Sequence, residues 1–442
     1  MDILDPIWLK KHLTSTKPAR IADDVAILIK EGTIRRGVKL PSVRDLAVEL
    51  GISPTSVSGA WKRLKAMNLI DGGGRAGITV TAASLTPRPM RFESELVTGD
   101  DIPFNLQLGV PDPKLLPNFQ TALAKLELPA DLHKYNRVTI TPRLQEAAAI
   151  DWPYQPETFL AVNGGYEGLV ISIRTLLRAG DVVLVESPTP PRILDVLDDN
   201  RCRSILINRD DEGPIASEVK AALEREPAAF LVQPVLHNPT GGSMSERRRD
   251  ELVELLKDHP EILIIEDDGF GLLAEQPHYT LSEHLPHHIY VRSYSKSHGS
   301  DLRLAVVESS EFIVDALHSF LGFGAGWTSR LLQELLAWML TDEDTRKKVH
   351  DATLVYAERR EALQSALARR GIPSTGGGLH VWVEVPDESF ALEVAKAHGI
   401  ALTTGLRYGI DTGHIRLSTG TLDPSNADQI ADVLDYCISR SS

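Results

Sequence analysis

Cysteine is scarce in this sequence, which places only Cys202 and Cys437 in 442 residues. So few cysteines exclude a disulfide framework and a cysteine-rich zinc site, and they suit a reducing cytosol. Long hydrophobic runs are also missing, because no stretch of about 18 uncharged apolar residues occurs. The first residues lack the apolar core of a signal peptide. We therefore expect a cytoplasmic protein with no membrane span and no metal site.

Apolar residues make up 42% of the chain and charged residues 24%, which suits a globular protein of two to four structural units. The charge is unevenly distributed. Residues 1–91 carry a formal net charge of +7 and the remainder carries −21. A basic N-terminal part on an acidic body indicates that only this part meets a polyanion.

Three regions differ in their residue patterns. Residues 1–81 alternate short helical patterns with turn signals, and residues 82–103 mix Pro, Ser, Thr and charges without apolar periodicity, as a linker does. From 104 to 442, short apolar runs alternate with amphipathic helical stretches. That alternation predicts an α/β domain with a mainly parallel sheet.

Two short helices joined by a tight turn are predicted in the N-terminal region. Ser42, with Asp45 three residues later, is a capping-box-like start for the first helix. Gly51 ends this helix, and Ser53 can cap a second one whose first residue is Pro54. This is the helix-turn-helix pattern.

The second helix directs small hydroxyls and basic side chains outward, while a glycine-rich strand pair follows it. Small hydroxyls let a helix approach base edges, and Lys or Arg can pair with phosphates. The segment NLIDGGGRAGITV predicts a wing with Arg75 at its tip, within reach of phosphate or the minor groove. An ordinary helical bundle with a solvated basic face is the alternative. The outward residues are Thr55, Ser56, Ser58, Lys62 and Arg63.

The run LPSVRDLAVELGIS, then TSVSGAWKRLKAMNLI, then the glycine-rich wing resembles the GntR-type winged helix-turn-helix over roughly residues 15–80. The resemblance implies binding to a double-stranded DNA operator. The expected DNA contacts are Arg44, Thr55, Ser58 and Arg75, together with Ser42, Ser56 and Lys62.

Chemistry-bearing residues follow three apolar runs in the larger region. Asn238 follows AFLVQPV, Asp267 ends EILIIED, and Lys296 follows HIYVRSYS, with successive members 29 positions apart. Loops after the carboxyl ends of parallel strands build ligand sites. We therefore expect the three loops to converge.

Pyridoxal phosphate chemistry needs such a set. Lys296 would form a Schiff base with the aldehyde, Asp267 would pair with the pyridinium nitrogen, and Asn238 would hold the ring hydroxyl. The phosphate requires backbone amides at a helix start, hydroxyls and an arginine. The residues expected to supply them are Gly164, Gly165, Ser293, Ser295 and Arg303.

In this order, NPTG, the acidic strand end, and SYSK followed by an arginine resemble the fold-type I aminotransferase superfamily over about residues 104–440. Joined to a GntR-type head, the chain resembles a MocR-type regulator. The resemblance implies a small C-terminal α+β subdomain at about 345–442, with His380 on its first strand. It also implies a head-to-tail homodimer, with Arg416 binding an effector carboxylate and Tyr135 reaching the partner's phosphate.

Two positions depart from the family's pattern. Pro190 stands where an aromatic ring stacks on the cofactor, and Gly269 stands where a tyrosine reaches the ring hydroxyl. A lost ring stack removes about 1 kcal/mol beyond burial, so cofactor binding should be weakened.

Three functions remain open. The first is a regulator that senses an amino compound or pyridoxal phosphate through the Lys296 imine, a role that does not need enzyme activity. The second is an active aminotransferase with an accessory DNA-binding head. The third is a regulator with a cofactor-free dimerisation body.

Overall fold

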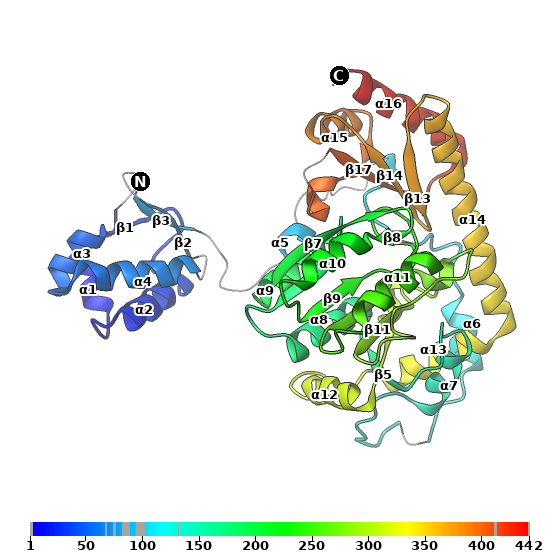
Figure 1. Ribbon diagram of the computed structural model, residues 1–442, viewed down its shortest axis with the longest axis horizontal. Helices are drawn as coiled ribbons and strands as arrows, with labels where there is room; N and C mark the ends of the chain where they lie inside the picture. The colour runs from blue at the N-terminus through cyan, green and yellow to red at the C-terminus, as the bar shows by residue number, and fades with distance from the viewer. Residues whose placement is uncertain are drawn as a thin grey trace. The chain divides into compact units, whose positions relative to one another are not determined.

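The computed structural model describes residues 3–66, 69–73, 77–81, 89–93, 102–130, 132–410 and 413–440. The chain forms two compact units, Met1–Arg88 and Pro89–Ser442, which we call the N-terminal and C-terminal units (Figure 1). Among the residues described, no helix is long and apolar enough to cross a membrane. Each unit has its own buried core.

The N-terminal unit packs helices against a three-stranded antiparallel sheet in the order β1–β3–β2. Leu46, Val57, Trp61 and Leu64 are buried in its core, so the predicted apolar faces point inward. Its elements are α1 (Pro6–His12), α2 (Pro18–Lys30), β1 (Lys39–Leu40), α3 (Val43–Leu50), α4 (Pro54–Ala66), β2 (Ile70–Gly72) and β3 (Ile78–Val80).

Local capping explains where the two central helices begin and end. The Ser42 hydroxyl accepts a hydrogen bond from the Asp45 amide at 3.1 Å and caps α3. Gly51 ends α3 with φ 68°, in the left-handed region that glycine enters without strain. Pro54 opens α4, as predicted. Helix α1 and strand β1 were not predicted, and Arg75 lies outside the described residues.

A single large sheet forms the centre of the C-terminal unit. Its order is β5–β12–β11–β10–β9–β6–β7–β8, and β6, β7, β9, β10 and β11 run parallel. The strands are β5 (Thr158–Val162), β6 (Val182–Ser187), β7 (Arg203–Asp210), β8 (Gly213–Pro214), β9 (Ala229–Val232), β10 (Leu263–Asp268), β11 (His288–Ser293) and β12 (Ala305–Ser309).

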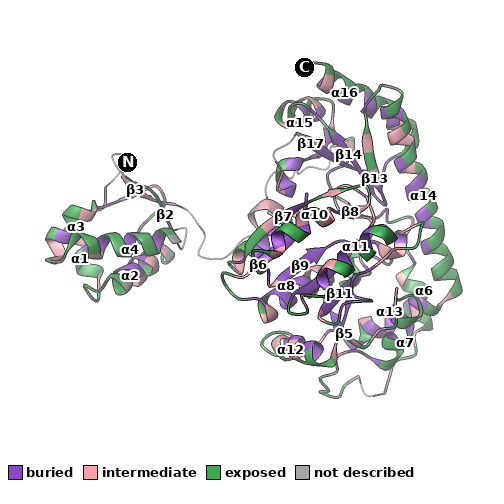
Figure 2. Ribbon diagram, viewed as in Figure 1, coloured by how far each residue is buried: buried purple, intermediate pink, exposed green. Residues whose placement is uncertain are grey.

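Helices cover both faces of this sheet, and Figure 2 shows its central strands as buried. Val183 and Val185 of β6 face α8, α9 and α12, whereas Leu184 between them faces α10 and α11. This alternation is the period of a strand buried on both sides. The helices are α6 (Phe119–Lys125), α7 (Pro142–Ile150), α8 (Gly165–Leu176), α9 (Pro191–Asp199), α10 (Ala216–Leu223), α11 (Glu246–Leu256), α12 (Glu311–Leu321) and α13 (Arg330–Thr341).

A smaller α+β subdomain follows the long helix α14 (Glu343–Ala368), which reaches it from the large sheet (Figure 1). Its sheet has the order β13–β14–β17–β16 and carries its own core. The remaining elements are α5 (Met90–Glu93), β4 (Phe104–Asn105), β13 (Ser374–Gly377), β14 (His380–Glu384), α15 (Glu388–Ala397), β15 (Ile400–Ala401), β16 (Thr403–Thr404), β17 (His414–Ser418) and α16 (Ala427–Arg440). Helix α5 lies within the predicted linker region 82–103.

Glycine lets the small subdomain approach the strand-end loops closely. Gly241, in the loop after β9, has φ 77°, and a Cβ atom there would lie 1.9 Å from the Gly377 amide nitrogen of β13. Backbones can meet at this distance only without a side chain between them. Gly241 therefore sets how near the loop after β9 and strand β13 come to each other.

Replacing Gly241 with Ala should lower the unfolding temperature of the C-terminal unit more than Gly371→Ala does. Gly371 has φ 72° and open space where a Cβ atom would lie, so its replacement measures backbone strain alone, about 1–2 kcal/mol. Overpacking at Gly241 adds roughly 1–3 kcal/mol. Calorimetric unfolding of both variants checks this, and equal losses would contradict the close approach.

Candidate functional site

The loops after β9, β10 and β11 converge on one cavity of about 410 Å³, as the sequence predicted. Gly165, Asn238, Asp267, Ser293, Lys296 and Arg416 all line it. Arg416 comes from β17 of the small subdomain, so both parts of the C-terminal unit contribute. The other lining residues are Phe92, Gln107, Leu108, Gly109, Val110, Tyr166, Leu169, Pro190, Pro191, Arg192, Ile193, Gln233, Gly269, Phe270, His380, Thr403, Arg407 and Tyr408.

The two neighbouring aspartates of β10 have different partners because side chains alternate along a strand. Asp268 accepts from Arg292 Nε at 2.8 Å, and although burial opposes it, Arg292 holds the pKa of Asp268 below its usual range. Asp267 lines the cavity and accepts from Gln233 Nε2 at 2.7 Å. Burial, assisted by Asp268 and Glu186, raises the pKa of Asp267 to about 6. Asp267 is therefore the carboxylate that a cationic ring nitrogen would meet.

Gln233 links Asp267 to Asn238 and was not predicted. Its side-chain oxygen accepts a hydrogen bond from the backbone amide of Asn238 at 3.0 Å, and its side-chain nitrogen donates to Asp267. The Asn238 side-chain oxygen accepts from Arg416 Nη1 at 3.0 Å. This chain of hydrogen bonds fixes the orientation of three side chains along one wall. A glutamine shortly before the NPTG turn was the available sequence signal.

Lys296 is buried among positive charges. Its ammonium donates to the Gly109 carbonyl, and its nitrogen lies 5.9 Å from the centre of the Phe270 ring. Burial, followed by the charges of Arg416, Arg192 and Arg303, lowers the pKa of Lys296 to about 8. A neutral amine is the form that attacks an aldehyde, so this environment favours reaction near neutral pH.

The start of α8 provides the expected anion cradle. Gly164 precedes the helix with φ 98°, and a Cβ atom there would lie 2.6 Å from the Arg303 guanidinium. A Cβ on Gly165 would lie 3.0 Å from that of Ser293. Helix amides, a hydroxyl and a guanidinium thus surround one point, which suits a phosphate. Of the predicted phosphate residues, Gly165 and Ser293 line the cavity, whereas Gly164, Ser295 and Arg303 do not.

Buried polar atoms without partners test whether the residues fit the cofactor. Within the described chain, Arg192 Nε, Arg416 Nε and both ring nitrogens of His380 are buried and make no hydrogen bond. A buried donor without a partner costs about 1–3 kcal/mol, which an anionic ligand in this cavity would recover. The residues present therefore fit pyridoxal phosphate.

His380 and Arg192 have positions in the site that the sequence did not assign. Burial, then the charges of Arg416 and Lys296, lowers the pKa of His380 far below its usual value, so its imidazole is neutral. The Arg192 guanidinium stacks on the Tyr166 ring at 3.6 Å. The location of Arg192 just beyond Pro190, at a strand-end loop, was the signal that could have identified it.

The two departures from the family's pattern both face the cavity. Pro190 and Gly269 line it, and a Cβ on Gly269 would meet nothing within 4 Å. Phe270 occupies the neighbouring wall and carries no hydroxyl. Tyr135 lies outside the cavity with 87% of its surface exposed, and its ring packs edge-on against Trp327 at 4.8 Å. Its expected role toward a partner subunit stays a prediction.

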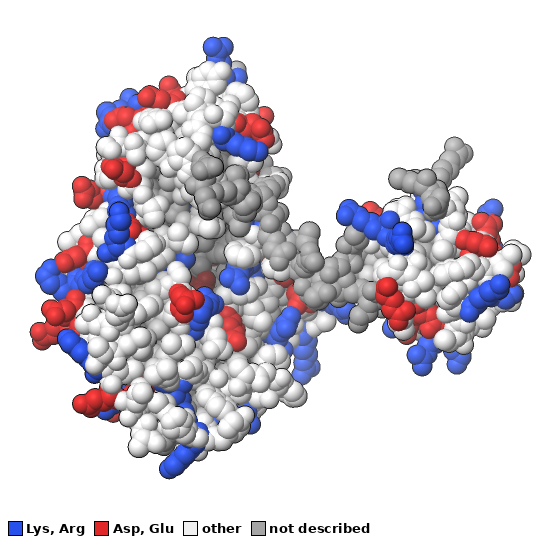
Figure 3. All heavy atoms as spheres, turned by 180° about the vertical axis from the view of Figure 1, so that it is seen from behind, with Lys and Arg blue, Asp and Glu red and all other residues white. Residues whose placement is uncertain are grey.

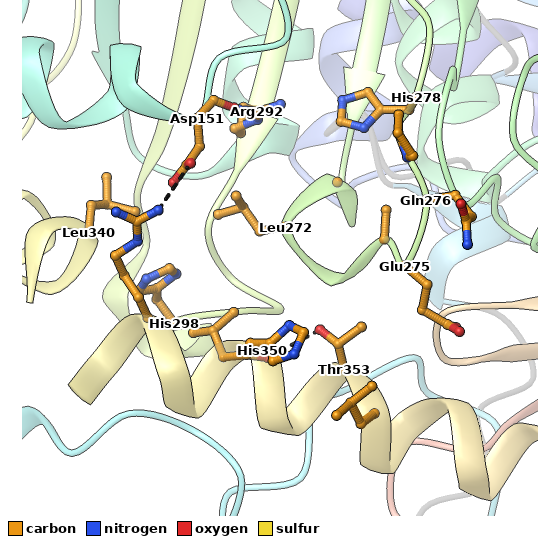
Figure 4. Close-up of a pocket in the computed structure, with 16 residues that line it drawn as sticks. Asp151, Leu272, Glu275, Gln276, His278, Arg292, His298, Leu340, His350 and Thr353 are labelled. Atoms are coloured by element: carbon orange, nitrogen blue, oxygen red, sulfur yellow. Dashed lines mark hydrogen bonds and ion pairs between the residues drawn. The ribbon is translucent and has the colours of Figure 1, made fainter. Parts of the chain in front are cut away.

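A second cavity, of about 710 Å³, lies between the 3₁₀ turn Gly271–Leu273 and α14, and Figure 4 shows His350 and Thr353 of α14 facing Leu272. Its charged residues already have partners, since Arg292 binds Asp268 and Asp151 pairs with Arg346 at 3.4 Å. None of the predicted cofactor residues lines it. The larger volume therefore does not mark the site.

The expected DNA-contacting side chains lie on the surface of the N-terminal unit. Ser42, Arg44, Thr55, Ser58 and Lys62 are exposed, and Ser56 is half-buried. The Ser53 hydroxyl contacts those of Thr55 and Ser56 at 2.7 and 3.0 Å, which groups them at the start of α4. Figure 3 shows acidic and basic side chains mixed on the face it presents, so net charge alone does not locate the DNA surface.

Two family models match this chain. "Bacterial regulatory proteins, gntR family" matches residues 17–80, and "Aminotransferase class I and II" matches residues 101–434. No group of three His, Cys, Asp or Glu side chains that could hold a metal occurs in the described ranges.

Two transcriptional regulators are similar to this chain over nearly their full length, and a solved aminotransferase shares the fold of the C-terminal unit. The vitamin B6 salvage pathway transcriptional repressor PtsJ of Salmonella typhimurium is 31% identical, covering 95% of this chain and 98% of that one. The HTH-type pyridoxine biosynthesis transcriptional regulator PdxR of Corynebacterium glutamicum is 26% identical, covering 92% of each chain. The α-aminoadipate aminotransferase LysN of Thermus thermophilus shares the fold at 22% identity, with a TM-score of 0.68 over 76% of this chain and 92% of that one.

Attachment of pyridoxal phosphate to the cofactor-free protein should accelerate with pH, with a midpoint near pH 8. The reason is that the lowered pKa of Lys296, about 8, sets the fraction of neutral amine. An ordinary lysine would continue to gain reactivity towards about pH 10. The initial rate of appearance of the visible absorbance band measures this. Arg416→Gln removes a neighbouring cation, so its midpoint should move to higher pH; a wild-type midpoint near 10 would contradict the assignment.

Proposed function

This chain belongs to the MocR-type regulators, in which a gntR-family DNA-binding domain is joined to an aminotransferase class I and II domain, and from that premise we propose that it controls vitamin B6 genes in response to pyridoxal phosphate. It is a DNA-binding transcription regulator, and its aminotransferase-like domain binds pyridoxal phosphate. The convergence of Lys296, Asp267 and Asn238 around one cavity carries the proposal. Two relatives that align over nearly the full chain are named as regulators of vitamin B6 salvage and pyridoxine biosynthesis, which supports pyridoxal phosphate as the signal.

Pyridoxal phosphate supplies an aldehyde and an electron-accepting ring when bound. The residues of this chain bind and orient it: Lys296 offers the amine, Asp267 the carboxylate for the ring nitrogen, and Asn238 a polar contact for the ring edge. Gly164, Gly165, Ser293 and Arg303 would hold the phosphate. Ser295 is proposed from its place in the sequence alone, because its side chain does not line the cavity.

A sensor must release its ligand when the ligand becomes scarce, and the cavity suits that requirement. Pro190 provides no aromatic ring to stack on the cofactor, and Phe270 has no hydroxyl to donate. Each missing interaction raises the dissociation constant, by roughly tenfold for about 1.4 kcal/mol. We propose that these replacements place the affinity within a concentration range that the cell can vary.

We further propose a head-to-tail homodimer that acts in the cytoplasm. Tyr135 and Phe323 are 87% and 92% exposed, and Trp327 packs against Tyr135, which makes an aromatic surface. Exposed aromatic surfaces favour association between proteins. Neither Cys202 nor Cys437 forms a disulfide bond, which suits a reducing compartment.

Adding pyridoxal phosphate should change operator affinity at least tenfold in the wild-type protein and much less in Lys296→Ala. The ligand can shift DNA binding only through different affinities for two arrangements, and Lys296 provides its covalent hold. Fluorescence anisotropy with a duplex selected from random sequences measures the effect. Pyridoxamine phosphate, which has no aldehyde, is the matched ligand control. Equal wild-type affinities with and without pyridoxal phosphate would refute the proposed signal.

Arg44→Ala should weaken operator binding about tenfold, and Thr55→Ala should weaken it by a smaller factor. Arg44 lies in the first turn of α3 and Thr55 in the first turn of α4, and both side chains are exposed. Arg20→Ala, on α2, removes the same charge from the same unit and serves as the control. If Arg20→Ala weakens binding as much as Arg44→Ala, the effect is one of net charge and the contact assignment is wrong.

A further inference from the structure

Helix α5 comes directly after the segment that connects the two units, and it packs on α9 of the C-terminal unit (Figure 1). The Asp195 carboxylate accepts hydrogen bonds from the backbone amides of Arg91 and Phe92, at 3.2 and 3.0 Å. The Arg91 guanidinium contacts Asp195 at 3.3 Å and Asp198 at 2.7 Å. Asp195 is buried, so these bonds hold α5 more firmly than exposed ion pairs would.

The Phe92 ring of α5 reaches the wall of the Lys296 cavity. Arg192 lies over this ring at 4.5 Å and over the Tyr166 ring at 3.6 Å, so its guanidinium is stacked between two aromatic side chains. All three residues line the cavity. Arg407, another lining residue, donates to the Phe92 carbonyl.

We propose that Phe92 is a ligand-contacting residue of this cavity, and that a planar aromatic anion bound there strengthens the docking of α5 on α9. The proposal rests on the proposed function, in which pyridoxal phosphate is that anion. Arg192 Nε is buried without a hydrogen-bond partner, so an anionic oxygen can fix the guanidinium in its stacked position. A fixed guanidinium in turn holds the face of Phe92.

Docking of α5 sets the length of chain between the DNA-binding unit and its anchor. When α5 is docked, the anchor Arg91 lies ten positions after Thr81. When α5 is released, the next anchor is Phe104, 23 positions after Thr81, which pairs with β15. A chain spans at most about 3.5 Å per residue, so the maximum reach more than doubles when α5 is released. A shorter connection restricts the positions available to the DNA-binding unit and so changes how two such units meet an operator.

Hydrogen exchange of the full-length protein tests the docking directly. Saturating pyridoxal phosphate should slow the exchange of the Arg91 and Phe92 amides at least threefold, because these amides bond to Asp195. The visible absorbance band establishes that the ligand is bound. If the band forms and exchange in 89–93 does not slow, the inference is wrong whatever happens to DNA binding.

Phe92→Ala tests the coupling to DNA at ligand concentrations that give the full absorbance band. The ratio of operator affinities with and without pyridoxal phosphate should fall to less than twofold. Phe92→Tyr, which keeps the ring, should restore the wild-type ratio. Tyr436→Ala is the matched control, because it removes a stack with Arg440 at 5.7 Å on α16 and lies outside the cavity.

The outcomes separate the two proposals. If pyridoxal phosphate does not change the DNA affinity of the wild-type protein, the proposed function is refuted. The hydrogen-exchange experiment then still tests whether Phe92 contacts the ligand. A wild-type protein that responds, together with a Phe92→Ala variant that responds equally, refutes the coupling through α5. If Phe92→Ala fails to fold, Asp195→Ala removes the anchor of α5 instead and should abolish the same response.

Discussion

Buried positive charge at one end of the central sheet is the constraint on which this structure depends. Lys296, Arg192 and Arg416 share a cavity with Asp267, and Gln233 already holds that carboxylate. Burial of cations is costly unless a partner offsets it, so the cavity is completed by an anion. The same excess of positive charge contributes to the lowered pKa of Lys296, because burial and the neighbouring guanidinium groups favour its neutral form.

The fold brings these charges together from distant parts of the chain. Strands β9, β10 and β11 end side by side and present Asn238, Asp267 and Lys296, while α14 connects to the subdomain that supplies Arg416. Close contact of glycine backbones at 241 and 377 lets that subdomain approach. The anion site therefore exists only when both parts of the C-terminal unit are assembled.

In the proposed mechanism, the same cavity connects ligand binding to the regulation of DNA binding. Its wall includes Arg192, which stacks between Tyr166 and Phe92, and Phe92 follows the connecting segment. In a catalytic aminotransferase, a firm grip on the cofactor serves turnover. Here Pro190 and Phe270 leave that grip incomplete, which suits a protein whose occupancy must follow the ligand concentration.

Residue patterns that act locally were predictable, and contacts made through space were not. The Ser42 cap, the Gly51 turn and the Pro54 helix start depend on neighbouring residues, so their sequence signals were sufficient. His380 and Gln233 were given no role, because their importance arises from which elements pack beside them. Helix α5 was predicted as part of a linker, since four residues carry too little periodicity to indicate a helix.

The sequence by itself determined the two-part organisation, the DNA-binding class of the N-terminal unit and the order of the cofactor residues along the chain. Those features follow from short-range periodicity, capping and the spacing of strand ends, which are properties of consecutive residues. Only the tertiary structure explained why the cavity is lined by Asp267 and not by Asp268, because Asp268 pairs with Arg292 of the neighbouring strand. It also decided that Phe92 reaches the cavity, since long-range packing places a residue about 100 positions from Arg192 against its guanidinium.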